Sequence, residues 1–249
     1  MDRPPHDATH GPTHKRHLGR LRRQLEQYLT LKDVVVALPR SGRSYTILTP
    51  ADHDRLLDEA ESDPEQHLPY WAEIWPSGIA LADLVLARAA ALNGLAVLEL
   101  GSGLGVTAAA ALTAGAELLA ADYAAVSLAL CRYNTLRNAG REPDTIEINW
   151  RQPPPELLDR ADALGGYPLI LAADVLYERR DVAPLLAITA RLLARDGALW
   201  LAEPGRDAAR RFLDAADELG WQRESEEHDG PWADGARVRV GLHIMRRPI

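Results

Sequence analysis

The sequence predicts a doubly wound α/β fold with a mostly parallel sheet, and three observations support this prediction. Five short apolar runs alternate with amphipathic segments from residue 78 onward. The runs are almost continuously apolar, as in strands that are buried on both faces. Each intervening segment is long enough for the helical crossover that parallel strands require. We therefore expect ligands to bind at the carboxyl ends of these strands.

The N-terminal quarter precedes this alternation. Residues 1–17 are polar, contain Pro and Gly, and lack periodicity, which predicts a disordered tail. Residues 18–68 are expected to form a small elaboration packed on the main domain. Its apolar spacing predicts a helix from Leu18, then two strand-like runs joined by a turn at Ser41-Gly42, then a short helix over 52–60.

The main domain is predicted to comprise residues 69–249, a length that suits one large α/β sheet. Its helices are expected at 79–92, 106–115, 125–140, 156–164, 182–197 and 206–220. Its apolar strands are expected at 96–101, 116–123, 144–150, 167–175 and 198–205. Two further strands, at 221–228 and 236–247, form a pair at the C-terminal end. The prediction is thus a seven-stranded sheet in which a C-terminal strand runs antiparallel.

Composition restricts the possible partners. The chain carries 28 Lys and Arg against 36 Asp and Glu, a net charge of −8. No basic tract stands out, which argues against nucleic-acid binding as the main role. No apolar run reaches ~18 residues and the N-terminus lacks the apolar core of a signal peptide, so no membrane association is expected. We expect a soluble, cytoplasmic monomer.

Neither a disulfide nor a metal site is expected. Cys131 is the single cysteine, and it falls in a helical stretch where a buried structural role is the simplest interpretation. His6, His10 and His14 recur every four residues, which on a helix would align them as metal ligands. The Pro and Gly between them oppose a helix there.

A glycine-rich turn at residues 101–105 is the sharpest local signal. It follows the first apolar strand and precedes a helix, and Gly101 and Gly103 allow a tight turn and close approach of a ligand to the backbone. Asp122 ends the next strand, 21 residues after Gly101. A carboxylate at that place can accept hydrogen bonds from both hydroxyls of a ribose.

Three kinds of ligand suit such a turn, and packing alone is a fourth explanation. A dinucleotide turn has the pattern G-x-G-x-x-G, but Val106 stands where the third glycine belongs. A P-loop would need Gly-Lys-Ser/Thr, which is absent. Glu99 lies two residues before the turn, and its negative charge repels a pyrophosphate but suits a cationic sulfonium and a free amino group. Electrostatics therefore favour S-adenosylmethionine over NAD.

Several segments together resemble a known family. Residues 99–105 resemble motif I of class I S-adenosylmethionine-dependent methyltransferases, whose fold is Rossmann-like. Residues 69–78, PYWAEIWPSG, resemble the Trp-containing segment before motif I in methyltransferase family 16. Asn149-Trp150 resembles the Asp-Trp at a strand end, and residues 174–177 resemble the D-x-x-Y motif. The segments span residues 68–205 in the order and spacing of the lysine methyltransferases of the electron-transfer flavoprotein β subunit.

The resemblance and the glycine turn together imply a cofactor site. Its expected members are Trp75, Glu99, Gly101, Ser102, Gly103, Asp122, Tyr123 and Trp150. Trp75 is expected to wall the methionine part of the cofactor, whereas Tyr123 and Trp150 are expected at the adenine. Asn149 departs from the family pattern, in which an acid stands there, so recognition of the adenine amino group is in doubt.

Two residues are expected to act on the acceptor. Asp174 follows the fourth apolar strand, and we expect it to capture and aim an incoming lysine; a helix N-cap is the alternative. Tyr177 is expected to shape the lysine channel. Ser77 could be either a helix N-cap or a cofactor contact. Glu203 could either contact the substrate or form a salt bridge to a nearby Arg.

The leading functional prediction is protein-lysine methylation, and the resemblance implies a protein partner similar to the electron-transfer flavoprotein β subunit. Small-molecule N-methylation uses the same core, and residues 18–68 would suit a lid for such a substrate. An NAD(P)-binding oxidoreductase is disfavoured by Glu99 and by the missing third glycine. A non-catalytic adaptor is disfavoured by the intact turn and the retained Asp122 and Asp174.

Overall fold

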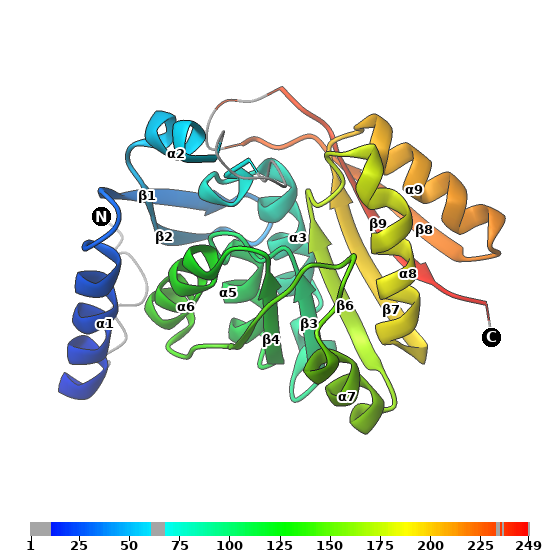
Figure 1. Ribbon diagram of the computed structural model, residues 1–249, viewed down its shortest axis with the longest axis horizontal. Coiled ribbons are helices and arrows are strands. Elements are labelled where there is room, and N and C mark those ends of the chain that lie inside the picture. The colour runs from blue at the N-terminus through cyan, green and yellow to red at the C-terminus, as the bar shows by residue number, and fades with distance from the viewer. Residues whose placement is uncertain (1–10, 61–67, 233–234, 236, 249) are drawn as a thin grey trace.

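The central element is one seven-stranded sheet. The computed structural model describes residues 11–60, 68–232, 235 and 237–248. The strands of this sheet lie in the order β5-β4-β3-β6-β7-β9-β8 (Figure 1). Their bounds are β3 Ala96–Leu100, β4 Glu117–Asp122, β5 Asp144–Glu147, β6 Tyr167–Ala173, β7 Leu193–Glu203, β8 Gln222–His228 and β9 Val240–Arg246. The pairings from β5 to β7 are parallel, and β9 runs antiparallel to both β7 and β8. The predicted fold class is thereby confirmed.

Helices cover both faces of this sheet. One face is covered by α3 Pro76–Ala87, α4 Ala89–Leu92, α5 Val106–Thr113 and α6 Ala125–Ala139. The other is covered by α7 Pro155–Leu164, α8 Val182–Leu192 and α9 Asp207–Glu218. Successive strand residues alternate between the two cores: Val97 belongs to the first and Leu98 to the second, and both are fully buried. Burial on both faces is why the strands are almost continuously apolar.

The sheet reverses its strand order between β3 and β6. The chain builds outward from β3 through β4 to β5, then returns across the sheet to add β6 and β7 on the other side of β3. Loops at the carboxyl ends of β3 and β6 therefore diverge and leave room between them for a ligand. This position is where the sequence places the glycine turn and Asp174.

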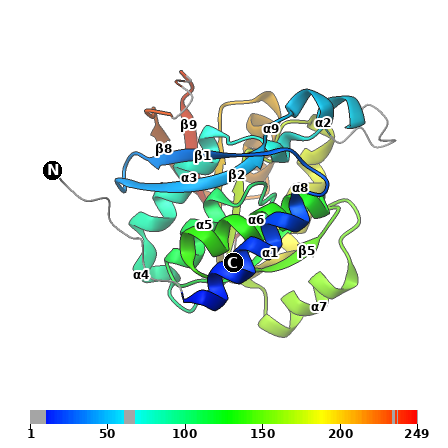
Figure 2. The same cartoon turned by 90° about the vertical axis from the view of Figure 1, so that its left-hand side faces the viewer.

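The N-terminal elements pack on the first helical face and share its core. They are α1 Pro12–Leu25, the hairpin β1 Leu31–Leu38 and β2 Arg43–Pro50, and α2 His53–Ala60. Figure 2 shows the hairpin lying across α3 with α1 beside α6. The side-chain amide of Asn134 on α6 accepts from Leu48 N at 2.7 Å and donates to Leu48 O at 3.0 Å, and Asn138 pairs in the same way with Thr46.

The first helix begins earlier than predicted. Residues 12–17 belong to α1, so the part of the expected 1–17 tail that the structure describes is helical and not disordered. The reason is that Pro12 stands in the first turn, where its fixed φ favours a helix and its missing N–H costs nothing. His6 and His10 of the expected histidine row lie outside the described residues. None of the helices within the described ranges has the length and apolar character needed to cross a membrane.

Two internal boundaries also differ from the prediction. The helix expected over 182–197 ends at Leu192, and β7 begins directly at Leu193. Its pairing with β6 shifts register between Tyr167 and Leu169, so the residues around Gly197 form an irregular strand segment that the sequence pattern does not distinguish from a helix end. The helix expected over 79–92 is divided at Arg88 into α3 and α4.

Candidate active site

A cavity lies at the carboxyl ends of β3, β4 and β6, beneath the 3₁₀ turn η1 Tyr70–Ala72. It gathers eight of the ten residues expected in the site. They are Trp75, Gly101, Gly103, Asp122, Tyr123, Trp150, Asp174 and Tyr177. Tyr70, Trp71, Glu73, Ala173 and Val175 complete the lining. Glu99 and Ser102, the other two expected residues, are buried behind the turn at 2% and 6% exposure and do not line the cavity.

The glycine turn brings bare backbone to the cavity. The amides of Gly101 and Ser102 both donate to Ala121 O on β4, at 2.8 and 3.1 Å, which closes the turn against the neighbouring strand. Gly101 has φ +73°, a conformation that favours glycine. A Cβ on Gly101 would lie 2.6 Å from Val175 Cγ1, so a side chain has no space there. The turn therefore depends on glycine for both its shape and its clearance.

Two buried carboxyl groups flank the turn. Asp122 accepts hydrogen bonds from Gly103 N at 2.8 Å and Ala124 N at 3.2 Å. Burial raises the pKa of Asp122, and these amide bonds oppose the rise. Burial raises the pKa of Glu99 well above its usual range, and the nearby Asp122 adds to this. Among the described residues no group hydrogen-bonds to Glu99 Oε2, so this buried acceptor behind the turn has no partner.

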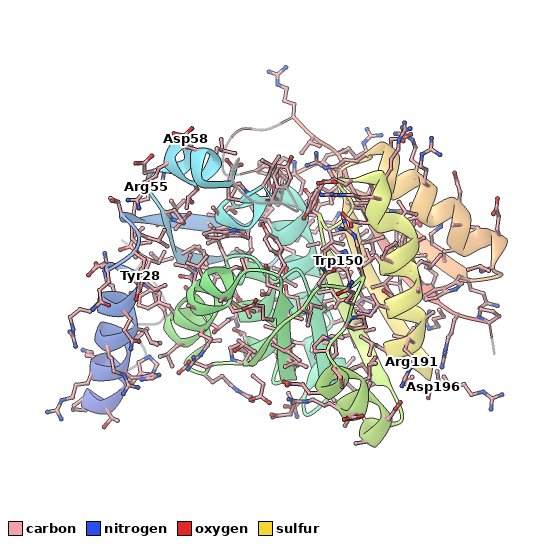
Figure 3. All side chains as sticks on the ribbon, viewed as in Figure 1. Tyr28, Arg55, Asp58, Trp150, Arg191 and Asp196 are labelled. Carbon is pink, nitrogen blue, oxygen red and sulfur yellow. The ribbon has the colours of Figure 1, made fainter. Side chains whose placement is uncertain are left out.

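Aromatic rings form the walls of the cavity. Tyr70 and Tyr177 pack with centroids 4.6 Å apart, and Tyr70 meets Trp75 edge-on at 6.3 Å. Trp75 Nε1 donates to Tyr70 O at 2.9 Å, which fixes the indole beside the turn. Tyr123 is fixed from the other side, because its hydroxyl donates to Leu68 O at 2.7 Å. Trp150 lies near the centre of the molecule in Figure 3, on the segment after β5.

Asp174 is held in an uncommon backbone conformation. Its φ is +53°, and among the described residues it is the only non-glycine residue with a positive φ. Its amide donates to Ala202 O at 2.9 Å, which ties the end of β6 to β7. The carboxyl group is 5% exposed; Oδ1 accepts from Arg206 Nε at 3.1 Å and Oδ2 from Ser77 Oγ at 3.3 Å. Strain of this kind occurs mostly at functional sites.

The alternative interpretations of Asp174 and Ser77 as helix caps are wrong. The 3₁₀ helix η2 Arg179–Asp181 follows Asp174 and has Glu178 as its N-cap residue, and α8 then begins at Val182 with Asp181 in that position. Ser77 is not the cap of α3, because Trp75 occupies that position and the Ser77 hydroxyl donates to Asp174. Neither side chain therefore caps a helix: Asp174 lines the cavity, and the buried Ser77 donates to it from behind.

Arg206 is a member of the site that the sequence reasoning missed. It pairs with Asp174, and its guanidinium carbon lies 5.5 Å from the centroid of the Trp75 ring. The salt bridge from Glu203 to an arginine, one of its two interpretations, is not formed with any described arginine. Glu203 instead accepts from Gly205 N and pairs with His243 at 3.2 Å. Its position in the sequence could have identified it, because Arg206 directly follows Glu203-Pro204-Gly205 at the carboxyl end of a strand.

The residues fit the cofactor that the turn suggests. Asp122 lines the cavity and offers an acceptor for ribose hydroxyls, and aromatic faces at Trp75 and Trp150 suit a sulfonium and a purine. Glu99 Oε2 is an unpartnered buried acceptor directly behind the turn, and its negative charge favours a cationic ligand there. The glycine turn leaves a backbone cradle that a Cβ at Gly101 would fill. In the described part of the chain, no three His, Cys, Asp or Glu side chains are grouped as metal ligands would be.

Replacing Glu99 with Gln is expected to stabilise the free protein and weaken its cofactor affinity. A carboxyl whose folded pKa lies above its ordinary 4.5 contributes stability below pH 4.5, and this is lost as pH rises through the folded pKa. At pH 7 Glu99→Gln should therefore raise the free energy of unfolding by about 1 kcal/mol, or roughly 2–4 °C in Tm. Thermal melts from pH 4 to 8 measure this, with the exposed Glu117→Gln as control. Equal pH dependence in the wild type and Glu99→Gln would contradict the assignment.

Comparison with curated proteins shows two groups of relatives. The electron transfer flavoprotein beta subunit lysine methyltransferase of Mus musculus is 45% identical over 123 residues, which are 47% of this chain and 43% of that protein. The histone-arginine methyltransferase METTL23 of Mus musculus is 26% identical over 132 residues, which are 52% of this chain and 51% of that protein. This chain thus spans about half the length of the curated relatives it matches.

Solved structures show the same fold at low sequence identity. Magnesium protoporphyrin IX methyltransferase from Synechocystis PCC 6803, with bound S-adenosylmethionine, gives a TM-score of 0.52 at 17% identity, over 80% of this chain and 100% of that one. An O-methyltransferase from Bacillus cereus in complex with S-adenosylhomocysteine gives 0.51 at 14%, over 79% and 93%.

A family model described as "Lysine methyltransferase" matches residues 66–218, which is more than half of the chain and includes the glycine turn, Asp122, Trp150 and Asp174. The chain therefore belongs to methyltransferase family 16, with the class I S-adenosylmethionine-dependent methyltransferase fold and S-adenosylmethionine as its cofactor.

Proposed function

We propose that this protein transfers a methyl group from S-adenosylmethionine to the side-chain amine of a lysine in a protein. One observation carries the proposal: a buried carboxylate, Asp174, lies in an aromatic-walled cavity that also contains the glycine turn. A carboxylate attracts a cationic acceptor, and the aromatic walls accommodate an alkyl chain and a positive charge. The flanking Tyr177 and Tyr70 suit a narrow channel for that chain.

The cofactor supplies an activated methyl group on a sulfonium that is itself a good leaving group. The protein therefore needs no nucleophile of its own. Glu99 and Gly101 would receive the amino-acid part of the cofactor, Asp122 its ribose, and Trp150 its adenine. The remaining task is to orient the acceptor, and well-oriented approach supplies ~7–11 kcal/mol of the barrier.

The acceptor amine must lose its proton before it can attack. With an ordinary pKa of ~10.4, keeping a lysine neutral at pH 7 costs about 4.6 kcal/mol in water. Desolvation in the cavity and a neighbouring cation both lower this pKa. Asp174 alone does the reverse, since a carboxylate favours the ammonium form. We therefore assign Asp174 to capturing and aiming the lysine, and not to abstracting its proton.

The choice of lysine in a protein is supported by the family and by one group of relatives. The proteins named electron transfer flavoprotein beta subunit lysine methyltransferase are 33–46% identical to the matched segments of this chain. A protein similar to that β subunit is accordingly the partner we propose. The histone-arginine relatives make arginine the competing acceptor. A small-molecule amine would satisfy the same cavity, and an NAD(P) oxidoreductase is disfavoured by the buried acid Glu99 beside the turn.

Incubating the purified protein with methyl-labelled S-adenosylmethionine and a cell lysate is expected to label a protein at lysine. Peptide mass spectrometry identifies the residue and counts its methyl groups. A matched incubation without the purified protein serves as the control, because label that appears there comes from other enzymes. Label on arginine, or on small molecules alone, would contradict the proposed acceptor but not the methyl transfer itself.

A further inference from the structure

Arg206 is directed toward Asp174 by the backbone that carries it. It is the residue that precedes α9, with φ −67° and ψ 155°. The turn before it is fixed: Gly205 has φ +82°, its amide donates to Glu203 Oε2, and its carbonyl accepts from Arg210 at 2.7 Å. The guanidinium then lies between the Asp174 carboxylate and the face of Trp75. The side chain is 39% exposed, so it lies at the surface beside the cavity-lining Asp174 and Trp75 and not in the core.

The charges around Asp174 make this arginine important for the acceptor. Six groups that face Asp174 or line its cavity have acidic or phenolic side chains. They are Glu203 from β7, Asp122 from β4, Tyr123 from the segment after β4, Glu73 and Tyr70 from the η1 segment, and Tyr177 from the loop after β6. Among the described residues that line the cavity there is no Lys or Arg. Burial raises the pKa of the Asp174 carboxyl, and the charge of Arg206 is the largest influence against that rise.

A lysine beside Asp174 alone would hold its proton more tightly than in water, which opposes methyl transfer. A second cation beside the same carboxylate reverses this effect, because two positive charges compete for one negative charge. Arg206 occupies Asp174 Oδ1, and Oδ2 has only a 3.3 Å bond from the Ser77 hydroxyl, which can rotate away. The amine therefore has an accessible oxygen while the guanidinium keeps the other.

We propose that Arg206 is a positioning residue that offsets the charge of Asp174, so that the acceptor amine is aimed by the carboxylate yet loses its proton at a lower pH than it would beside Asp174 alone. This inference rests on the proposed lysine acceptor. Asp174 binds the amine, and Arg206 prevents this carboxylate from raising the pKa of the amine.

The test compares pH–rate profiles of Arg206→Gln, Arg206→Lys and the wild type. The acceptor is the lysate protein that gains methyl-lysine, and S-adenosylmethionine is saturating. A nearby charge changes a pKa by roughly 1–3 units. For Arg206→Gln we therefore expect the rising limb of kcat to shift by at least about one unit to higher pH, with at least a tenfold loss at pH 7 that recovers at high pH. Arg206→Lys retains the charge and should return the limb toward its wild-type position.

Two controls separate this effect from a structural one. Arg211→Gln removes an exposed arginine of α9 that pairs with Asp207 and not with Asp174, so its profile should match the wild type. Calorimetry with S-adenosylhomocysteine checks that each variant retains a folded cofactor site. If Arg206→Gln does not fold or does not bind this ligand, Arg206→Met, which is also neutral, takes its place. A neutral variant whose rate falls equally at every pH would overturn the role of Arg206. A wild-type enzyme that yields no methyl-lysine would overturn the lysine acceptor instead.

Discussion

Asp174→Ala is expected to reduce methyl transfer by at least about a hundredfold while leaving cofactor affinity within a few fold of the wild type. The carboxyl is 5% exposed and is bonded by Ser77 and Arg206, so its loss removes the acceptor's only proposed counter-ion. Asp122, which we assign to the cofactor, is held by the amides of Gly103 and Ala124 and not by Asp174. Initial rates with the labelled acceptor and calorimetry with S-adenosylhomocysteine measure the two quantities separately.

Stability needs its own control, because removing a buried carboxylate also affects folding. Asp83 on α3 provides this control, because it is a buried acid (1% exposed) that does not line the cavity. Its carboxylate accepts hydrogen bonds from the amides of Arg40 and Ser41 and so fixes the turn of the β1–β2 hairpin. Asp83→Asn should lower Tm and leave the transfer rate of the folded enzyme nearly unchanged. Asp174→Asn keeps the shape of the side chain and tolerates positive φ, so it isolates the charge. Full activity in Asp174→Asn would mean that the charge does not bind the acceptor.

The expected site residues that the structure brings together are those defined by local spacing. The turn at residues 101–105 follows a strand directly, and Asp122 ends the next one, so the parallel register alone brings them together. Sequence spacing also predicted that Asp174 follows β6. Arg206 was missed because its proximity to Asp174 depends on how two separate loops, after β6 and after β7, bend toward each other.

Tyr70 was missed for a related reason. It belongs to a three-residue 3₁₀ turn that no periodicity indicates, and its contacts with Tyr177 and Trp75 make it part of the cavity. The early end of α8 was missed because Leu193 continues the apolar spacing of the helix. Its pairing with Tyr167 on β6 makes it the first residue of a strand instead. In each case a long-range contact determines what local sequence leaves open.

Gly101→Arg is expected to abolish cofactor binding, and the smaller change Gly101→Ala is expected to weaken it at least tenfold. Positive φ costs an L-residue about 1–2 kcal/mol. Gly94→Ala is the matched control, because Gly94 has the same φ of +73° but nothing within 4 Å of its would-be Cβ. Gly94→Ala should therefore lose stability alone. In Gly101→Ala the new Cβ also meets Val175 Cγ1 at 2.6 Å, so overpacking adds ~1–3 kcal/mol.

The double variant Gly101→Ala/Val175→Ala distinguishes a clash within the protein from obstruction of the cofactor. Removing Val175 Cγ1 leaves its Cβ as the nearest atom, at 3.9 Å, so the steric part of the stability loss should be relieved. Affinity for S-adenosylhomocysteine should stay low, because the added methyl group still covers backbone that the cofactor needs. If the double variant binds as tightly as Val175→Ala alone, the backbone at Gly101 is not the cofactor cradle, and the electrostatic assignment of Glu99 beside it loses its structural support.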